Sequence, residues 1–401
     1  MATVSVIVPV YNGAEFVAAA LDSALAQTYA DAEVIAIDDG SSDDTPAVLT
    51  RFAPRVRVLR QPNRGLSAAR NAGLAAATGR YVALLDADDT WEREFLELAV
   101  ARLSQLGEAV VGVFAGWVLT DRSGNVLSHT QTVRHGACTV RDFLRHSPFV
   151  PSTVTLRRAA VMAAGGFDEA LRAAEDWDLW LRLTGAGARF VALERCLCRY
   201  RVHEQNWSRD PARMRTGALR ALEKFFADPA LPAELKTEQA PAVARVHARA
   251  SSQLYAIGRA EDGAAALCAA VSAWPPILLE DETHWALVCA EQPIGYKGTP
   301  HHLDLAQGER HVRSAIEHCV GRVAGFDESL RRRAYGRAYR ALAQLAYGQR
   351  RMRSARRYAA AALRADRSLC ANWGTVGPLM KSFAGTTVID ALRRWRGRAA
   401  P

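Results

Sequence analysis

The sequence lacks features that are typical of disulfide-rich secreted proteins, of proteins with a structural zinc site and of membrane-spanning proteins. Its seven cysteines are odd in number and form no Cys-x-x-Cys pair, so neither a disulfide framework nor a zinc site is predicted. The longest apolar run, residues 109–119, has about half of the length that spans a membrane. No charged segment followed by an apolar one opens the chain. We therefore expect a cytoplasmic protein with reduced cysteines and no integral membrane anchor.

Two nucleotide-binding motifs are also missing. No Gly-x-Gly-x-x-Gly follows an expected strand, which argues against a dinucleotide-binding dehydrogenase. The first loop, residues 9–13, lacks the glycine-rich, basic character that nucleotidyltransferases use to hold a triphosphate. Nucleotidyl transfer is therefore kept only as an alternative enzyme class.

Charge is divided unevenly along the 401 residues. Residues 1–205 contain 21 Lys and Arg against 24 Asp and Glu, whereas residues 206–401 contain 30 against 18. Between residues 331 and 367 there are 12 arginines and a single acid, Asp366. Such a density fits either solvated helices or a face that meets a polyanion or lipid headgroups. Both interpretations stay open, and we expect no nucleic-acid partner.

The first half alternates strand and helix patterns, which predicts an α/β fold with a doubly wound, mainly parallel sheet. The expected strands are residues 4–10, 33–37, 56–59, 80–85, 189–193 and 196–202. Beyond residue 209 the pattern is all-helical, with two weak tetratricopeptide-like echoes at residues 246–275 and 339–363. We predict a catalytic domain over residues 1–208 and a basic, all-α domain over residues 209–401. Residues 379–398 combine apolar and arginine positions that suit a peripheral contact with the inner face of a membrane.

Three of the expected strands end in polar residues that suit a nucleotide. The carboxyl ends of parallel strands share one edge of a sheet, so residues 9–12, 38–42 and 86–89 should converge there. Asp39 can accept from the imide N–H of uracil or thymine, and Asp86 can accept from ribose hydroxyls. Asp88 can reach a hard divalent cation, Mg²⁺ or Mn²⁺, on a diphosphate. An acidic turn that caps the next helix is the alternative.

Four segments, in this order and at these separations, resemble glycosyltransferase family 2 of the GT-A fold: residues 4–12, 38–42, 63–73 and 84–89. The resemblance covers about the first 205 residues. It implies that Asp39 binds the base and that Asp86-Ala87-Asp88 is the DxD motif that holds ribose and the metal diphosphate. Pro9 and Tyr11 would complete the donor side, with Tyr11 as a flat face for the base. Arg70 either adds a cation near the phosphates or makes a surface salt bridge.

The reaction that the resemblance implies is inverting transfer of a sugar, which needs a base on the acceptor hydroxyl. Glu175 and Asp176 lie in the first turn of an expected helix, where acids also suit the helix dipole. The resemblance assigns the base to Asp176, with Glu175 or Asp178 as the next candidates. His203 ends a strand and is either structural or, as in similar family members, a further metal ligand. Residues 150–153 resemble the acceptor-side segment, and we assign them no chemistry.

The leading interpretation is a metal-dependent, inverting hexosyltransferase of cell-envelope polysaccharide biosynthesis. It would add one sugar from a UDP or dTDP donor to a glycan, lipid-linked or protein acceptor. Single addition is favoured because the chain has neither a Gln-x-x-Arg-Trp motif nor a membrane span. A non-catalytic scaffold that recruits partners through its helical half is the alternative from a different class.

Overall fold

The computed structural model describes residues 2–130, 136–204, 206, 209–290, 303–371 and 377. The chain divides into two compact units, Met1–Lys236 and Thr237–Pro401. The domain boundary predicted at residue 208 stays a prediction. The helix α8 (Pro211–Ala227), which follows that boundary, belongs to the first unit.

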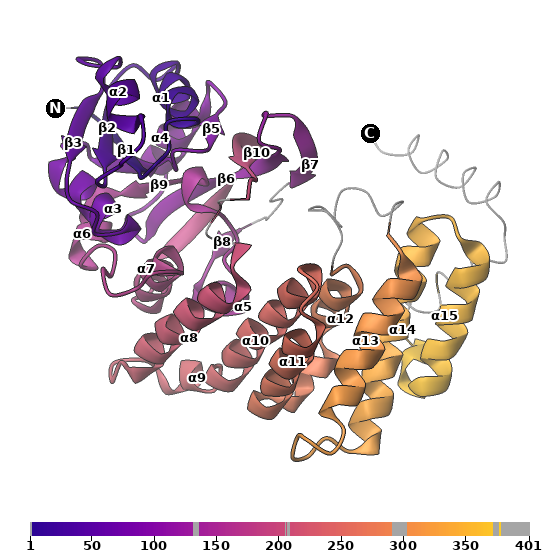
Figure 1. Ribbon diagram of the computed structural model, residues 1–401. Helices are drawn as coiled ribbons and strands as arrows, with labels where there is room; N and C mark the ends of the chain where they lie inside the picture. Colours follow the sequence, from indigo (N-terminus) through magenta and orange to yellow (C-terminus); the bar gives the residue numbers. More distant parts are fainter. Residues whose placement is uncertain are drawn as a thin grey trace, which may run out of the picture. The chain divides into compact units, whose positions relative to one another are not determined.

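The first unit is built on a ten-stranded mixed sheet in the order β3-β2-β1-β4-β9-β6-β10-β5, with β7 beside β6 and β8 beside β10 (Figure 1). The strands are β1 (Val4–Val10), β2 (Ala32–Asp38), β3 (Arg57–Arg60), β4 (Tyr81–Leu84), β5 (Thr90–Trp91), β6 (Val110–Thr120), β7 (Val126–Thr130), β8 (Ala137–Cys138), β9 (Val154–Arg157) and β10 (Arg189–Arg201). The four strands β1 to β4 are parallel, while β9 joins β4 and β6 antiparallel to both. The predicted α/β class is confirmed.

Helices cover both faces of the sheet, which explains why every residue of β1 is buried. The helices of this unit are α1 (Val17–Leu25), α2 (Thr45–Thr50), α3 (Leu66–Ala76), α4 (Phe95–Gln105), α5 (Val140–Arg145), α6 (Arg158–Ala163), α7 (Glu175–Gly185), α8 and α9 (Ala233–Lys236), with the 3-10 turn η1 (Pro151–Thr153). Gly73 brings α3 close to the sheet, since a Cβ there would lie 2.5 Å from Ile7 and 2.9 Å from Ile37. Close packing of α3 fixes the position of Arg70, one turn before Gly73.

The last long strand differs from expectation. We predicted two strands, residues 189–193 and 196–202, and the structure has one, β10, that runs through both. Its register against β6 shifts between Ala192 and Cys196 and again between Cys196 and Cys198. Bulges of this kind interrupt the alternation of side chains, and so they break the sequence pattern without ending the strand.

The second unit is all-helical among the residues that the structure describes, as predicted. Its helices are α10 (Gln239–Ala256), α11 (Ala260–Ala273), α12 (Asp281–Val288), α13 (Leu305–Cys319), α14 (Glu328–Gly348) and α15 (Met352–Ala365), with the 3-10 turns η3 (Pro275–Leu279) and η5 (Arg367–Ala371). Its core is rich in alanine, which lets helices approach closely. The tetratricopeptide-like echoes stay a prediction. Residues 379–398 lie outside the described residues.

Within the described ranges, no helix is both long and apolar enough to cross a membrane.

Candidate active site

The loops after β1, β2 and β4 meet at one edge of the sheet. Val10 at the end of β1 is paired with Asp38 at the end of β2, and Leu85 donates its N–H to Ile7 O on the other side of β1. Asn12, whose φ of 49° is left-handed, donates its N–H to Ser41 Oγ at 3.0 Å. The first two predicted polar segments are therefore in direct contact.

Asp39 holds the loop that leads into α3. Its carboxylate is buried and accepts hydrogen bonds from Gln61 Nε2 at 2.7 Å, Arg64 N at 3.0 Å and Gly65 N at 2.8 Å. Three donors share two carboxylate oxygens, which leaves acceptor capacity for one more N–H. On β1, Pro9 is buried, whereas Tyr11 just beyond the strand is 46% exposed. These positions suit a base that lies on Tyr11 and reaches Asp39.

Arg70 connects two regions that the sequence could not place together. Its guanidinium donates to Asp86 Oδ1 and to Glu175 Oε1, at 2.7 Å in each case, and its side chain is 1% exposed. The alternative of a surface salt bridge is therefore wrong. Burial opposes the charge of Arg70, but Asp86 and Glu175 raise its pKa above the usual value. Burial raises the pKa of Asp86 in spite of Arg70.

The predicted base, Asp176, follows Glu175 at the start of α7. It is half-buried, and burial together with the charge of Glu175 raises the pKa of Asp176 to about 7. The residue before the helix, Ala174, has a left-handed φ of 59°, which is strained for a residue with a Cβ. Asp178, one of the two further candidates, is 2% exposed and is paired with Arg182 at 2.8 Å and Lys224 at 2.8 Å. Its contacts are those of a structural residue.

Asp88, the second acid of the predicted DxD motif, faces the residues that follow β10. Asp88 Oδ2 lies 3.0 Å from His203 Nε2 and accepts a hydrogen bond from Asn206 Nδ2 at 3.1 Å. The ring of His203 stacks on Phe16, with 4.8 Å between the ring centroids. Asp88 and His203, the two predicted metal ligands, are thus neighbours although 115 residues separate them in the sequence.

Asp89 is the buried member of the acidic run. Its Oδ1 accepts from Arg201 N at 2.9 Å, and burial, with the charges of Asp88 and Asp86, raises its pKa well above the usual value. Arg201 also donates from Nε to Asp88 O at 2.9 Å. Asp89 and Arg201 therefore position the backbone of the acidic loop.

Sequence reasoning missed two residues that hold the segment Asp86-Ala87-Asp88. Ser152 in η1 is fully buried, and its Oγ accepts the N–H of Asp86 at 3.0 Å while its carbonyl oxygen accepts from Trp91 Nε1 at 2.6 Å. Asn206, which contacts Asp88, is the other. For Asn206 the sequence holds one signal, its place three residues after His203. Ser152 has none, because a hydroxyl that accepts a hydrogen bond from a backbone N–H far away in the sequence leaves no pattern.

The segment before α7 is fastened at both ends. Asn71 of α3 donates from Nδ2 to Phe167 O at 2.8 Å and accepts the N–H of Phe167 at 2.9 Å. Near the other end, α8 approaches so closely that a Cβ on Gly217 would lie 2.3 Å from Ala173 O. Residues 167–173 are thereby clamped between α3 and α8, and this supports the strained entry into α7.

A divalent cation is consistent with the donor set. Among the described residues, no group of three or more His, Cys, Asp or Glu gathers as a complete metal site. Asp88 and His203 nevertheless present a carboxylate and an imidazole 3.0 Å apart. Mg²⁺ and its relatives are commonly bound by one or two side chains plus substrate phosphates, so this pair fits an ion that arrives with a diphosphate.

Comparison with known proteins gives a family match over the first part of the sheet unit. Residues 5–163 match the family model described as Glycosyl transferase family 2. An uncharacterized glycosyltransferase of Rickettsia prowazekii (strain Madrid E) is 31% identical over 50% of this chain and 64% of its own length. One from Rickettsia typhi (strain ATCC VR-144 / Wilmington) is 30% identical over 56% of this chain and 69% of its own length. The succinoglycan biosynthesis protein ExoO of Rhizobium meliloti (strain 1021) is 33% identical over 51% of this chain and 62% of its own length.

Solved structures share the fold. S. aureus TarS 1–349 in complex with UDP-GlcNAc superimposes with a TM-score of 0.54 at 17% identity, covering 80% of this chain and 89% of that one. The mannosyltransferase PcManGT from Pyrobaculum calidifontis, in complex with GDP-Man and Mn²⁺, superimposes with a TM-score of 0.50 at 22% identity. The match covers 80% of this chain and 87% of that one. At these identities the likeness concerns the fold alone, and it confirms the predicted GT-A-type sheet.

Proposed function

Since this chain belongs to glycosyltransferase family 2, we propose that its first unit transfers a single hexosyl group from a nucleoside-diphosphate sugar to an acceptor hydroxyl, with inversion. The observation that carries the proposal is the contact of Arg70 with both Asp86 and Glu175, at 2.7 Å each. This buried guanidinium links Asp86, which we propose binds the donor, to Glu175, the residue before the proposed base Asp176. Acids that are buried close together repel each other and destabilise the fold, and a non-catalytic scaffold protein would gain nothing from such a cluster.

On the donor side, we propose that Pro9, Tyr11 and Asp39 receive the base and that Asp86 and Ala87 receive the ribose. Asp39 favours a base with an imide N–H, as in UDP or dTDP. UDP-GlcNAc is bound in the TarS complex and GDP-Man in the PcManGT complex, so the fold accommodates more than one base.

Asp88 and His203 would hold Mg²⁺ or Mn²⁺, with Asn206 orienting the Asp88 carboxylate through its 3.1 Å hydrogen bond. The bound ion would supply positive charge to the leaving diphosphate. Asp88 Oδ2 and His203 Nε2 lie 3.0 Å apart, so both could bind the same ion.

Asp176 is proposed to accept the proton of the acceptor hydroxyl. The hydroxyl oxygen forms the new bond to the anomeric carbon as the bond from that carbon to the diphosphate oxygen breaks, and the proton passes to the Asp176 carboxylate. A base is most effective when its pKa lies near the working pH, and the pKa of about 7 for Asp176 meets this condition. Arg70 positions Glu175, and so the start of α7, for this transfer.

The pH profile tests the base directly. Asp176 works only when ionised and its pKa is raised to about 7, so we expect kcat/KM to fall on the acid side with an apparent pKa near 7. Initial rates measured from about pH 5.5 to about pH 9 would define this limb. A rate that stays constant across neutral pH would contradict the assignment.

Release of nucleoside diphosphate tests the function itself. We expect the full chain, with MnCl₂ or MgCl₂, to release UDP or dTDP slowly from at least one nucleotide sugar, because water can replace the acceptor. The measurement is a coupled nucleotide assay over a panel of UDP-, dTDP- and GDP-sugars. If no donor binds or turns over with either metal, the scaffold alternative is favoured.

The acceptor class is also a proposal. The similarity of this chain to the succinoglycan biosynthesis protein ExoO supports a growing polysaccharide as the acceptor. Contact of the second unit with an anionic membrane surface stays a prediction, supported by the exposed Arg332, Arg333 and Arg353. A cytoplasmic location likewise stays a prediction.

A further inference from the structure

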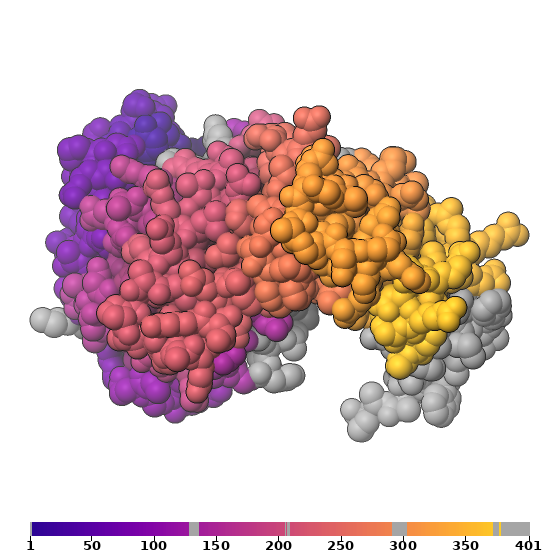
Figure 2. Space-filling view, turned by 90° about the horizontal axis from the view of Figure 1, so that it is seen from below, coloured from indigo at the N-terminus to yellow at the C-terminus, as the bar shows by residue number. Residues whose placement is uncertain are grey.

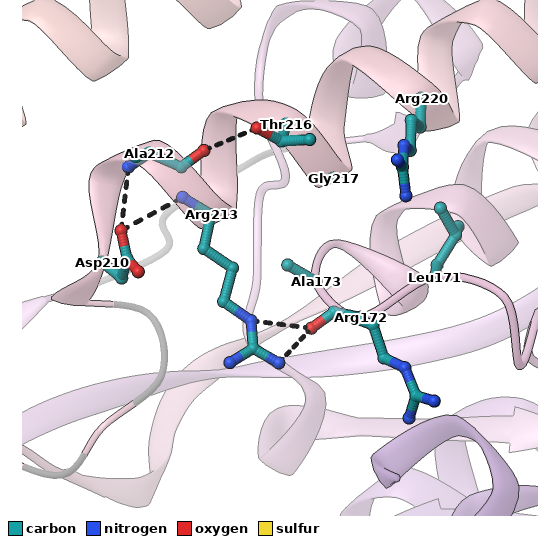
Figure 3. A pocket seen from close by; sticks show the side chains of 9 residues that line it. All are labelled: Leu171, Arg172, Ala173, Asp210, Ala212, Arg213, Thr216, Gly217 and Arg220. Carbon is teal, nitrogen blue, oxygen red and sulfur yellow. Dashed lines mark hydrogen bonds between the residues drawn. The ribbon is translucent and has the colours of Figure 1, made fainter. Parts of the chain in front are cut away.

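The first unit has a pocket of about 360 Å³ between the segment that precedes α7 and the first turns of α8 (Figure 3). The surface of α8 faces the viewer in Figure 2. Arg213 of α8 donates from Nε and Nη2 to Arg172 O, at 3.1 and 2.9 Å, and Arg172 donates from Nη1 to Arg64 O at 3.0 Å. Figure 3 shows the side chain of Arg172 directed away from Arg220, so the arginines of the lining do not converge on one ligand. The pocket fastens α8 to this segment, and we assign it no binding function.

Two thiol groups meet in the second unit. Cys268 lies in α11 and Cys319 is the last residue of α13, and Cys268 Sγ donates a hydrogen bond to Cys319 Sγ at 3.1 Å. Both are free cysteines in the structure. The two residues are 51 positions apart, so no short motif in the sequence reveals the pair. A disulfide bond is about 2.05 Å long, and the two sulfur atoms therefore need to approach by only about 1 Å to form one.

Helix packing keeps the two sulfur atoms close to each other. The helices α11 and α13 pack together in one hydrophobic core, to which α11 contributes Leu267 and Val271 and α13 contributes Ala315 and Ile316. Closing a loop of this length in a flexible chain carries a large entropic cost. Because the fold has already closed the loop, bond formation between these thiols requires little further ordering of the chain.

The two thiols differ in their access to solvent. Cys319 is fully buried, its Sγ donates to Ala315 O at 3.4 Å, and burial raises the pKa of its thiol above the usual value. Cys268 is half-buried at the edge of the same core. Oxidation of a thiol requires access and the thiolate form. We therefore expect a small oxidant to react with Cys268 first, while Cys319 lies behind it in position for the second step.

We propose that Cys268 and Cys319 are a modification site, at which a peroxide oxidant forms a disulfide bond that joins α11 to α13. The site lies in the second unit and does not depend on the transferase function proposed above. All seven cysteines are reduced until such an oxidant is present.

The reaction has two steps. In the first, Cys268 Sγ attacks one oxygen of hydrogen peroxide, the O–O bond breaks, and a sulfenic acid and one water are formed. In the second, Cys319 Sγ attacks the sulfenic sulfur, the S–S bond forms as the S–O bond breaks, and the leaving hydroxyl takes the Cys319 proton to give a second water. The two thiols lose two electrons and two protons, and the peroxide is reduced to water.

The test is peptide mapping of the full chain after treatment with hydrogen peroxide and alkylation of the remaining thiols in denaturant. We expect one pair of peptides joined through Cys268 and Cys319, with a mass lower by two hydrogens than the sum of the separate peptides. Dithiothreitol should separate them. The chain carries Cys370→Ser throughout, because Cys370 is exposed and can link two molecules. Cys289 is buried in the same core, where burial raises the pKa of its thiol to about 12, and should be recovered in alkylated form.

Variants separate the two steps. Cys319→Ser should stop the reaction at the sulfenic acid of Cys268, which dimedone labels, whereas Cys268→Ser should abolish both the label and the linkage. Cys289→Ser is the matched control and should leave the linkage unchanged. The linked chain should also unfold at a Tm several degrees higher than the reduced chain, because a bond between distant residues restricts the unfolded state.

Two results would overturn the modification site. If peroxide leaves Cys268 reduced, or carries it to a sulfinic acid without joining it to Cys319, the two sulfur atoms do not reach bonding geometry. If the same linkage forms as readily when peroxide is added in urea, the pairing arises in the unfolded chain and owes nothing to the contact between α11 and α13.

Discussion

Replacing Asp176 by Asn is expected to lower kcat by about 10²- to 10⁴-fold, the usual contribution of a positioned general base. The amide keeps the size of the carboxylate but cannot accept the hydroxyl proton. Donor affinity should remain near that of the parent, because Asp86 and Asp88 are unchanged. The measurements are single-turnover transfer rates and a calorimetric titration with UDP and MnCl₂.

The pH dependence of folding stability is an independent control for the Asp176→Asn variant. The pKa of Asp176 is raised to about 7 in the folded state, so ionisation costs folding free energy as pH rises from about 4 through 7. Asn carries no such cost. The variant should be at least as stable as the parent at about pH 8, and the difference should vanish below about pH 4, when both side chains are neutral. Loss of turnover with retained stability separates a chemical role from a structural one.

The neighbouring substitution Asp178→Asn should behave in the opposite way. It breaks the pairs that the buried Asp178 carboxylate makes with Arg182 and Lys224, so thermal stability should fall while the turnover of the folded fraction persists. If Asp176→Asn transfers sugar at nearly the parent rate, and Asp178→Asn does not, the base has been assigned to the wrong carboxylate.

Replacing Asp88 by Ala is expected to abolish the dependence of donor binding on metal. Residues that merely support a metal ligand typically contribute about 10- to 100-fold in metal affinity, so loss of a ligand should cost at least as much. Titration of UDP with and without MnCl₂ measures the effect as the ratio of the two dissociation constants. That ratio should be large in the parent and close to one in the variant.

Glu92→Gln is the control for charge. Glu92 lies near the acidic run and is paired at the surface with Arg199, at 2.9 Å. Its removal changes the net charge by the same amount without touching Asp88 or His203. An Asp88→Ala protein that still binds UDP more tightly with Mn²⁺ would place the ion elsewhere.

The edge of the sheet that we propose binds the donor was predictable, because the sequence patterns that mark it are local. A fully buried strand such as β4 has an apolar run that ends where solvent begins, so the three acids that follow Leu85 mark an edge whatever the rest of the chain does. The same holds for Asp39 after β2. Residues on parallel strands then converge by topology alone, and the segments 9–12, 38–42 and 86–89 needed no further information.

The connections made by side chains were not predictable. Arg70 could be placed on a helix before β4, but the direction of its guanidinium depends on Glu175, 105 residues away. The two-residue strand β5 has too few residues for any period, and β9 is antiparallel because of the chain path rather than its composition. Ser152 and Asn206 bind partners that only the folded chain brings near.

The contacts within the candidate site join residues that are far apart in the sequence, and this affects when the site can form during folding. Arg70 meets Glu175 across 105 residues, Asp89 meets Arg201 across 112, and Asp88 meets His203 across 115. Closing loops of this length carries a large entropic cost that local helices and hairpins avoid. During synthesis, the parallel strands β1 to β4 leave the ribosome long before β10 (Arg189–Arg201) and His203, which follows that strand. The contacts of Asp88 with His203 and of Asp89 with Arg201 can therefore form only after β10 has been synthesised.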